Sequence, residues 1–508
     1  MSNDFPVAVN PSVKTPGFAV LVNLLGGLPS SANGAPRALI MAPKSAAGSI
    51  TADTMIKRAV AGPDEVATYL GPGTLGHLCA QQLFGAHPYA KVDIIAPAAG
   101  GGTAATGTVV FGGTVTSNMV VRIWVKGVPI DVTWNVGTTV TQAGESFENL
   151  VNALTNKLPV SASNSSGTVT LTAKVAGPWG NDVLTYYEIL EGAGGTIVIT
   201  QIGSVVAGAT EPDFSTALSN IVSYEYDFII PCVSNADAQS ASATSNPGRL
   251  KTHLDTYDSG LSAKLQQAIV GLTGSLSSAI TGVVGRNIGP MEYPFCLNAK
   301  SLGCEFAGWE AGRRMLKEEV DPAVNRIGDN ESLGNLYGAH DLVADKPTDA
   351  EVEQALSNGL SIFNYDAQDD LYLVAPITTY SQDGSGNADD RLFYVSKVSG
   401  AYALAKALRR RLPIEYEGAK ISEDLTADDE SPPNGVVQVR EVKASVIEVC
   451  RDYVRRGVLD KNKFEAAVTS GDLVVRINPD NASQVDIVIP TDIVNPLARF
   501  STVILRRS

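Results

Sequence analysis

Two short apolar runs, RALIMA at Arg37–Ala42 and KVDIIAP at Lys91–Pro97, decide the fold of this chain. Each has the length and composition of a buried strand. Between them, Pro63–Glu65 opens a helix that ends at the turn Gly71–Gly73, and Thr74–Phe84 predicts a second helix. Buried strands that alternate with helices predict a largely parallel sheet with right-handed crossovers.

The next hundred residues follow a different pattern. Ala98–Gly107 (AAGGGTAATG) reads as a linker, and from about Thr108 to Val206 short runs of Val, Ile and Thr alternate between Gly, Asn and Ser. This pattern predicts an antiparallel β domain with one helix at Ser146–Lys157, and the glycines Gly192–Gly195 are expected to form a turn. The expected strands are Val120–Val125, Ile130–Trp134, Thr168–Ala173, Leu184–Ile189 and Thr196–Ile202.

The α/β rhythm resumes after Asp213, so the β domain is expected to be an insertion that splits one α/β domain. The expected helices here are Phe214–Ser223 and Pro247–Tyr257. The expected strands are Tyr226–Pro231, Gln267–Leu272 and Phe295–Ala299.

The rest of the chain predicts a helix at Gly303–Val320 and then a C-terminal α+β domain. In that domain Thr348, with Glu351 three residues later, forms the pattern of a capping box. The remaining expected helices and strands are Thr348–Asn358, Ile362–Asp366, Leu371–Pro376, Val395–Leu412, Val439–Gly457, Leu473–Asn478, Gln484–Pro490 and Arg499–Arg507.

The predicted fold class is therefore α/β within a multi-domain α+β chain. We expect an N-terminal extended arm (1–23), a split α/β domain (24–100 and 207–345), an inserted β domain (101–206), an inner C-terminal α+β domain (346–490) and a C-terminal strand arm (491–508).

Both ends of the chain are extended in character. Pro6, Pro11 and Pro16 punctuate Phe5–Asn23, and Arg499–Arg507 (RFSTVILRR) alternates like a β-strand. A free strand is a template for pairing with another chain. We therefore expect both arms to join neighbouring subunits through Phe5, Val7, Val9, Val13, Phe18, Val20, Val22, Phe500, Thr502, Ile504 and Arg506.

Composition narrows the possible partners. Charged residues are 18% of the 508 residues, below the roughly 25% of an average soluble domain, which fits a surface largely covered by copies of the same chain. The net charge of −15 argues against direct binding of nucleic acid, which needs clustered Lys and Arg. The first ten residues lack a secretory signal and no apolar run is long enough for a membrane span, so we expect synthesis in the cytoplasm without membrane insertion.

No pattern of catalytic, cofactor-binding or metal-binding residues stands out. The four histidines lack the spacing of a zinc site, and neither a GxSxG elbow nor a phosphate-binding GxxxxGK[ST] loop occurs. Asp383–Asp390 (DGSGNADD) lacks the spacing of a calcium loop and reads as a solvated loop. The five cysteines have long spacings and are expected to be buried free thiols. We therefore expect no enzyme and no cofactor.

A cluster of cations is prominent in this acidic chain. Lys406, Arg409, Arg410 and Arg411 lie at the end of the helix expected at Val395–Leu412. One interpretation is that they complement the negative end of the helix dipole. The other is a patch that binds a partner, and the sequence leaves both open.

The order of these pieces, together with several short motifs, resembles the tail sheath proteins of contractile bacteriophages, in their Mu-like branch. The resemblance covers nearly the whole chain. Its motifs are FPVAVNPSVKTPGFAV (Phe5–Val20), PDEVATYLGPGTLGHLCAQQLFGAHPYAKVDIIA (Pro63–Ala96), TVTLTAKVAGPWGND (Thr168–Asp182), AGWEAGRRMLKEEVDPAVNRIGDNESLGNLYG (Ala307–Gly338) and SNGLSIFNYDAQDDLYLVAPITTY (Ser357–Tyr380).

The resemblance implies a structural protein of the virion that is assembled in the cytoplasm of the host bacterium. Such subunits form stacked hexameric rings around a tail tube, and their arms exchange strands between neighbours. A metastable extended sheath contracts and drives the tube through the host envelope for genome delivery. Implied partners are copies of the chain, the tube protein, and the baseplate and tail terminator proteins. The basic cluster becomes a candidate tube-facing surface.

Three alternatives remain open from the sequence. A phage-derived contractile device, such as a contractile bacteriocin, would use the same kind of subunit. An α/β enzyme with an inserted β domain needs polar residues clustered after Ala42, Pro97, Pro231 or Leu272, where ligands of such sheets bind. A tail-tube or capsid subunit fits the strong α/β rhythm poorly.

Overall fold

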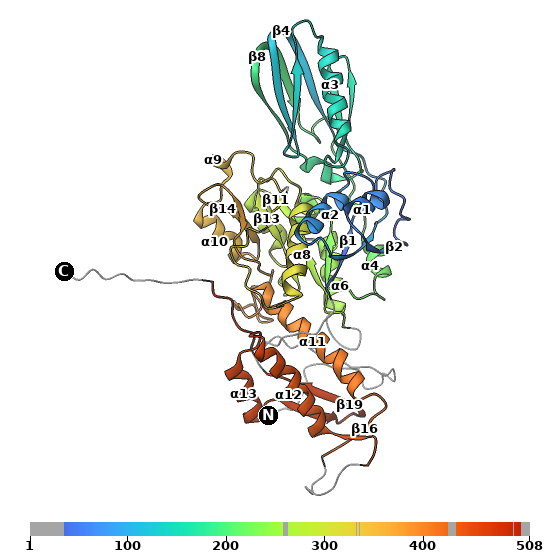
Figure 1. Cartoon of the computed structure of the whole chain (residues 1–508), viewed down its shortest axis with the longest axis vertical. Coiled ribbons are helices and arrows are strands. Elements are labelled where there is room, and N and C mark those ends of the chain that lie inside the picture. The colour runs from blue at the N-terminus through green and yellow to red at the C-terminus, as the bar shows by residue number, and fades with distance from the viewer. Residues whose placement is uncertain are drawn as a thin grey trace, which may run out of the picture.

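The computed structural model of the chain describes residues 35–257, 263–331, 333–334, 336–424, 433–490 and 492–498. Figure 1 shows three parts along the long axis: a β-sheet with helix α3 at one end, an α/β body in the middle, and a group of helices and short strands at the other end. No helix in these described ranges is long and apolar enough to cross a membrane.

The body is built on a six-stranded sheet of order β12-β10-β9-β1-β3-β2, in which every neighbouring pair is parallel except β2 with β3. This sheet confirms the expected α/β arrangement. Its strands are β1 (Arg37–Met41), β2 (Ile56–Val60), β3 (Lys91–Ile95), β9 (Phe228–Pro231), β10 (Gln267–Ile269) and β12 (Met291–Glu292).

Helices cover both faces of the sheet, because alternate side chains of its central strands enter two different cores. Ala38 and Ile40 of β1 pack with α1 (Pro63–Leu70), α2 (Leu75–Ala86) and α8 (Gly303–Glu318). Leu39 and Met41 pack on the other face with α4 (Ser215–Asn220), α6 (Asn246–Tyr257) and α7 (Leu276–Val283).

Between β3 and β9 the chain forms a separate five-stranded antiparallel sheet, which we call the inserted sheet. Its long strand β4 pairs with β5 and β7 along one side and with β8 along the other, and β6 pairs with β7. The elements are β4 (Thr106–Val125), β5 (Val128–Trp134), α3 (Val140–Ala153), β6 (Val160–Ser165), β7 (Thr168–Ala173), η2 (Pro178–Asp182) and β8 (Thr185–Thr200).

A second sheet of the body has the order β11-β13-β14-β15. Helix α10 starts at Thr348, whose side chain accepts from the Glu351 amide while the Glu351 carboxylate accepts from the Thr348 amide, so the expected capping box is confirmed. The elements of this region are α5 (Asn235–Ala238), β11 (Leu272–Gly274), β13 (Pro294–Leu297), α9 (Leu342–Asp345), α10 (Asp349–Ser357), β14 (Ser361–Tyr365) and β15 (Leu371–Leu373).

Helix α11 (Val395–Glu415) runs from the body into the C-terminal part, which is held by an apolar cluster of its own. Two small sheets lie there, each of two strands among the described residues. The elements are β16 (Lys420–Ser422), β17 (Val436–Gln438), α12 (Val439–Arg455), α13 (Lys461–Ser470), β18 (Val474–Asn478) and β19 (Asn481–Val488).

Several boundary predictions are wrong. Leu184–Ile189 and Thr196–Ile202 are not two strands around a turn but one strand, β8, in which Gly192 and Gly194 take positive φ at irregularities of the ladder. Helix α3 begins at Val140 rather than Ser146, because Thr139 and Gln142 form a capping box that the prediction missed. Strands β2 and β6 and helix α13 were also missed.

The expected strand Gln267–Leu272 is divided between two sheets, as β10 and β11. The chain passes the start of α8 at this point, where a Cβ on Gly271 would lie 1.7 Å from the carbonyl oxygen of Gly303. Only glycine permits this approach, and the crossing takes the chain out of the first sheet.

Candidate assembly surfaces

The residues expected to form inter-subunit arms lie outside the described residues. This applies to the N-terminal set (Phe5, Val7, Val9, Val13, Phe18, Val20 and Val22) and to the C-terminal set (Phe500, Thr502, Ile504 and Arg506). Their role in strand exchange stays a prediction.

The β18–β19 hairpin is a surface that such arms could use. Its strands pair in antiparallel fashion from Val474–Val488 to Asn478–Asn481, and among the described residues each strand bonds along one edge only. Its apolar side chains, including Val475 and Ile487, pack into the cluster around α11 and α12. A two-stranded sheet is only marginally stable on its own, and this hairpin is stabilised because one of its faces packs on the cluster around α11 and α12. Its two outer edges are available for further strands.

The basic cluster on α11 is engaged within the chain. The ammonium of Lys406 lies 2.6 Å from Asp227, directly before β9, and Arg409 donates to the Ala263 carbonyl and contacts Glu225 at 3.4 Å. These bonds tie α11 to the body.

Further along the helix, Arg411 pairs with Glu415 and Glu448, and Arg410 is not free either. The sequence had suggested a dipole role or a partner surface, and the structure adds a third role, which is attachment of α11. The tube-facing role stays a prediction.

A buried ionic network surrounds α8, within the segment Ala307–Gly338 that carried part of the resemblance. Arg314 reaches Glu292 of β12 at 3.1 Å, Gln267 of β10 at 2.6 Å and Ser399 of α11 at 2.8 Å. One guanidinium thus connects the six-stranded sheet with α8 and α11.

The second part of this network lies beside Arg314. Arg326 makes a two-bond pair with Glu310, at 2.5 and 2.8 Å, and both Arg326 and Arg313 bond Asp329. Burial and the nearby Glu310 raise the pKa of Glu292 above its ordinary value, and Arg314 and Arg326 oppose this shift. The sequence analysis missed the network because its ion pairs span turns of the chain, 3 to 22 positions apart, that follow no regular spacing.

The inserted sheet is fastened to the body at the tip of its β4–β5 hairpin. The Lys126 ammonium lies 2.6 Å from a carboxylate oxygen of Glu305 on α8, and both side chains are buried. The other oxygen of Glu305 accepts from the Leu302 amide at 2.9 Å. Gly127 lies against the ring of Tyr337, where a Cβ would meet the ring at 2.8 Å.

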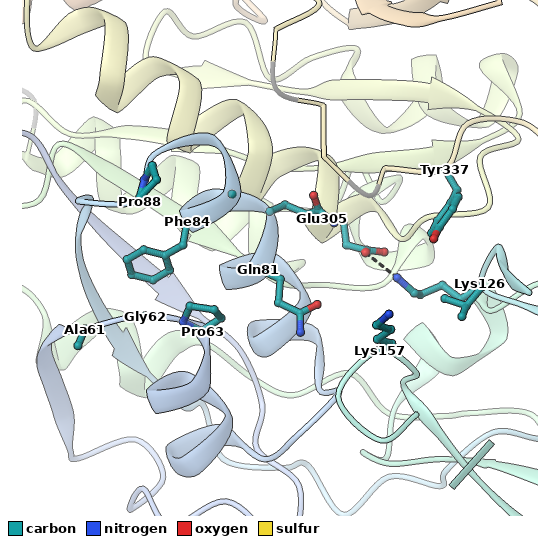
Figure 2. A pocket seen from close by; sticks show the side chains of 13 residues that line it. Ala61, Gly62, Pro63, Gln81, Phe84, Pro88, Lys126, Lys157, Glu305 and Tyr337 are labelled. Carbon is teal, nitrogen blue, oxygen red and sulfur yellow. Dashed lines mark hydrogen bonds and ion pairs between the residues drawn. The ribbon is translucent and has the colours of Figure 1, made fainter. Parts of the chain in front are cut away.

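A cavity of about 520 Å³ lies at this junction (Figure 2). Phe84, Pro63 and Pro88 form an apolar part of its lining, and Lys126, Lys157 and Glu305 form the charged part. The Lys126–Glu305 pair drawn in Figure 2 satisfies two of these charges internally. We assign the cavity no ligand.

A second fastening uses hydrogen bonds from a lysine to backbone carbonyls. Lys174, after β7, donates to the carbonyls of Pro72, Thr155 and Leu158 at 2.5–3.1 Å, which joins the end of α3 to the turn before α2. Burial lowers the pKa of His77 to about 4, and its Nδ1 accepts from the Gly73 amide at 2.8 Å. This histidine has a structural role.

Buried carboxyl groups form the third fastening. Asp182 of η2 accepts from the Asn235 amide at 2.9 Å, and Glu211 accepts from the amide and hydroxyl of Ser234 at 3.1 and 2.8 Å. Burial raises the pKa of each to about 7; the nearby Asp237 raises that of Glu211 further, while hydrogen bonds from Asn235 oppose the shift of Asp182. No ion pair of either group occurs in the described part of the chain.

Ser234 and Asn235, which these carboxylates bind, follow the carboxyl end of β9, where a ligand of an α/β enzyme would bind. Their hydrogen-bonding groups are directed at one another across the junction, and no group of three or more metal-ligating side chains suited to a metal ion is found within the described ranges. These hydrogen bonds therefore connect the inserted sheet to the body.

No family model matches the chain, and no curated protein matches its sequence. Among solved structures, the chain is similar to a sheath tail protein from Listeria innocua (TM-score 0.41, 12% identity, 85% of this chain and 87% of that chain). It is also similar to a sheath tail protein from Desulfitobacterium hafniense (TM-score 0.44, 11% identity, 88% and 91%). A third similar structure is the helical sheath of the anti-feeding prophage in its contracted state (TM-score 0.42, 9% identity, 99% of each chain). These three solved structures are thus two sheath tail proteins and one helical sheath in a contracted state.

Proposed function

We propose that this chain is the structural subunit of a contractile phage tail sheath. Copies polymerise as stacked hexameric rings around a tail tube and contract from a metastable extended state, which drives the tube through the host envelope. The proposal includes the tube, baseplate and tail terminator proteins as partners, and placement in the virion after assembly in the bacterial cytoplasm. No catalytic step and no cofactor belongs to it.

The observation that carries the proposal is the β18–β19 hairpin. It has two available edges in the described part of the chain and an apolar face anchored on α11 and α12. A strand added to such an edge forms backbone hydrogen bonds that persist while the attached bodies rotate. The terminal segments Phe5–Asn23 and Arg499–Arg507 have the extended character that this exchange needs.

The internal joints support movement of each subunit as a rigid body. Lys126–Glu305, Arg314 with its partners, and Lys406–Asp227 connect the inserted sheet, the body and α11. A subunit that holds its own parts together leaves the shared strands as the hinges between subunits.

Electron microscopy of the purified full chain tests the proposal. We expect striated cylinders or hollow tubes, and we expect deletion of residues 499–508 to abolish them while the melting temperature of the protein stays within 2–3 °C of the parent, an allowance of about 1 kcal/mol or less. A monodisperse monomer at high concentration, or tubes that form equally well after the deletion, would contradict the proposal. A phage-derived device would give the same tubes and is distinguished by particles without a head.

A further inference from the structure

The inserted sheet has three outer edges, and they differ in how they are protected. β5 and β6 lie on one side of the sheet and β8 on the other, where it pairs with β4. In Figure 1 β8 runs along the outer side of this sheet. Proteins normally protect exposed edges with proline, charged side chains, bulges or covering groups.

The β6 edge is closed by side chains of α3. Asn152 bonds both the amide and the carbonyl of Ala162, each at 3.0 Å, and Glu148 accepts from the Asn164 amide at 3.0 Å. The outward amide and carbonyl of Ala162 and the amide of Asn164 are therefore occupied.

The β5 edge is protected by proline. Lys126 and Gly127, both with positive φ, form a two-residue turn, so Val125 and Val128 are a hydrogen-bonded pair and the residues that alternate with Val128 face outward. Pro129 is the first of these, and it has no amide hydrogen to offer.

The same alternation identifies the outward residues of β8. Since Val125 bonds toward β5, Trp124 and Arg122 bond toward β8, at Tyr186 and Glu188. Thr185, Tyr187 and Ile189 therefore direct their backbone groups outward. Gln201 bonds both the amide and the carbonyl of Thr185, which closes that end.

Tyr187 and Ile189 have neither a proline nor a side chain that covers their backbone groups; what protects this edge is the charge of Glu188 and Glu191 and the irregularity of the ladder after Ile189. No side chain in the described part of the chain bonds their outward amides and carbonyls, and the side chains of Tyr187, Ile189 and Leu190 are about 40% exposed, at 41%, 42% and 40%. Neighbouring Glu188 and Glu191 are exposed and form no ion pair with a described residue. Arg122, opposite Glu188, is held by Asp131 through bonds of 2.6 and 2.7 Å.

We propose that the edge Tyr187–Glu191 of β8 is a docking site for an extended, cationic segment of a different protein. The unbonded amides and carbonyls match a strand and no other secondary structure. The charged side chains of the segment that contains β8 are all acidic, because no Lys, Arg or His occurs from Val175 to Gly248. A second copy of β8 is the poorer occupant, since antiparallel pairing around Ile189 would bring four glutamates together.

The probe is a fluorescein-labelled peptide of sequence KVTVKVTVK, titrated with the full chain and followed by fluorescence anisotropy. We expect Ile189→Pro, which removes an outward amide and leaves the β4 ladder intact, to weaken binding at least tenfold. The matched control is Thr133→Pro on the outward register of β5, which should leave binding unchanged. Glu188→Lys with Glu191→Lys should transfer the preference to the peptide EVTVEVTVE.

A peptide with alternate backbone nitrogens methylated keeps the charge and loses the hydrogen bonds. We expect the methylated peptide not to bind. If circular dichroism shows that Ile189→Pro does not fold, the methylated peptide tests by itself whether backbone hydrogen bonds hold the added strand. The proposal is overturned if the methylated peptide or the Ile189→Pro chain binds as well as the parent, or if KVTVKVTVK does not bind at all. Self-association that Ile189→Pro abolishes, seen by sedimentation without peptide, would assign the edge to a second copy instead.

Discussion

At the scale of single residues, buried charges connect segments that are far apart in the sequence. Lys126 and Glu305 are 179 positions apart, and their side chains are 4% and 1% exposed. Such a pair adds little net stability over an apolar pair, but removing one partner leaves an uncompensated charge in the interior. The joint is therefore sensitive to single substitutions.

We expect Lys126→Met to destabilise the protein by about 3–5 kcal/mol, because Glu305 is left buried and unpaired. The double variant Lys126→Met, Glu305→Gln should recover most of the loss, since the glutamine oxygen still accepts from the Leu302 amide. Urea denaturation followed by tryptophan fluorescence measures both. A double variant as unstable as the single one would show that lost packing, not charge, causes the effect.

Asp182 and Glu211 predict a pH dependence of the same joint. Their pKa values in the folded protein, about 7, lie above the ordinary 3.8 and 4.5, so the folded state keeps protons that the unfolded chain releases. Their stabilising contribution is complete below pH 4 and is lost as the pH rises to 7, by up to about 1.4 kcal/mol per pH unit for each group.

Melting temperatures between pH 4.5 and 7.5 measure this dependence. Asp182→Asn with Glu211→Gln should flatten the curve, whereas Asp131→Asn, at an exposed site, should not. A parent protein whose stability does not fall over this range would contradict the assignment.

At the scale of elements, α11 joins two cores. Its first half packs Val398 and Tyr402 against Leu265 of the body, and its second half packs Leu408 and Leu412 against α12. Lys406 and Arg409 lie where the helix leaves the body and bond to residues before β9 and β10. The helix is thus the mechanical connection between the body and the β18–β19 hairpin.

A test of the tube-facing cluster has to separate a contact with the tube from the bonds that Arg409 makes within the chain. Arg409→Glu places a carboxylate beside Glu225, and we expect it to lower stability by about 1 kcal/mol. The charge swap Arg409→Glu with Glu225→Arg should restore the ion pair but not the bond to the Ala263 carbonyl, so we expect it to recover part of the lost melting temperature. If the swapped chain also assembles on purified tubes as the parent does, Arg409 has no tube contact. Failure of the swapped chain to assemble would support one.

At the scale of the whole molecule, the apolar cores do not follow the three parts seen in Figure 1. One continuous cluster includes β1, β3 and α2 of the body together with β4, β5, β7 and α3 of the inserted sheet. The C-terminal part has a separate cluster. Continuity of packing predicts which parts unfold together.

Calorimetry should therefore show two transitions. We expect one for the body together with the inserted sheet and one for residues 395–490, identified by limited proteolysis between the two temperatures. A separate transition of the inserted sheet would mean that its shared core does not couple it to the body.

Local signals predicted most of the elements correctly, because each depends on neighbours in the sequence. The run Arg37–Ala42, the capping box at Thr348 and the helix from Val395 are where the pattern placed them. The misplaced boundaries share a cause, which is that packing from a distant segment overrides the local pattern. Gly271 against Gly303 divides one predicted strand, and pairing with β4 holds β8 straight through its glycines.

The sequence by itself determined the fold class, the order of most elements and the acidic composition of the chain, since these follow from periodicity and residue content. Only the tertiary structure decided the partners of its charges: Arg409 with Glu225, Lys126 with Glu305, and Arg314 with Glu292. It alone also separated the protected edges from the open one at β8. These ion pairs and strand pairings join residues from about 20 to more than 180 positions apart, and no local pattern encodes which segment arrives beside them.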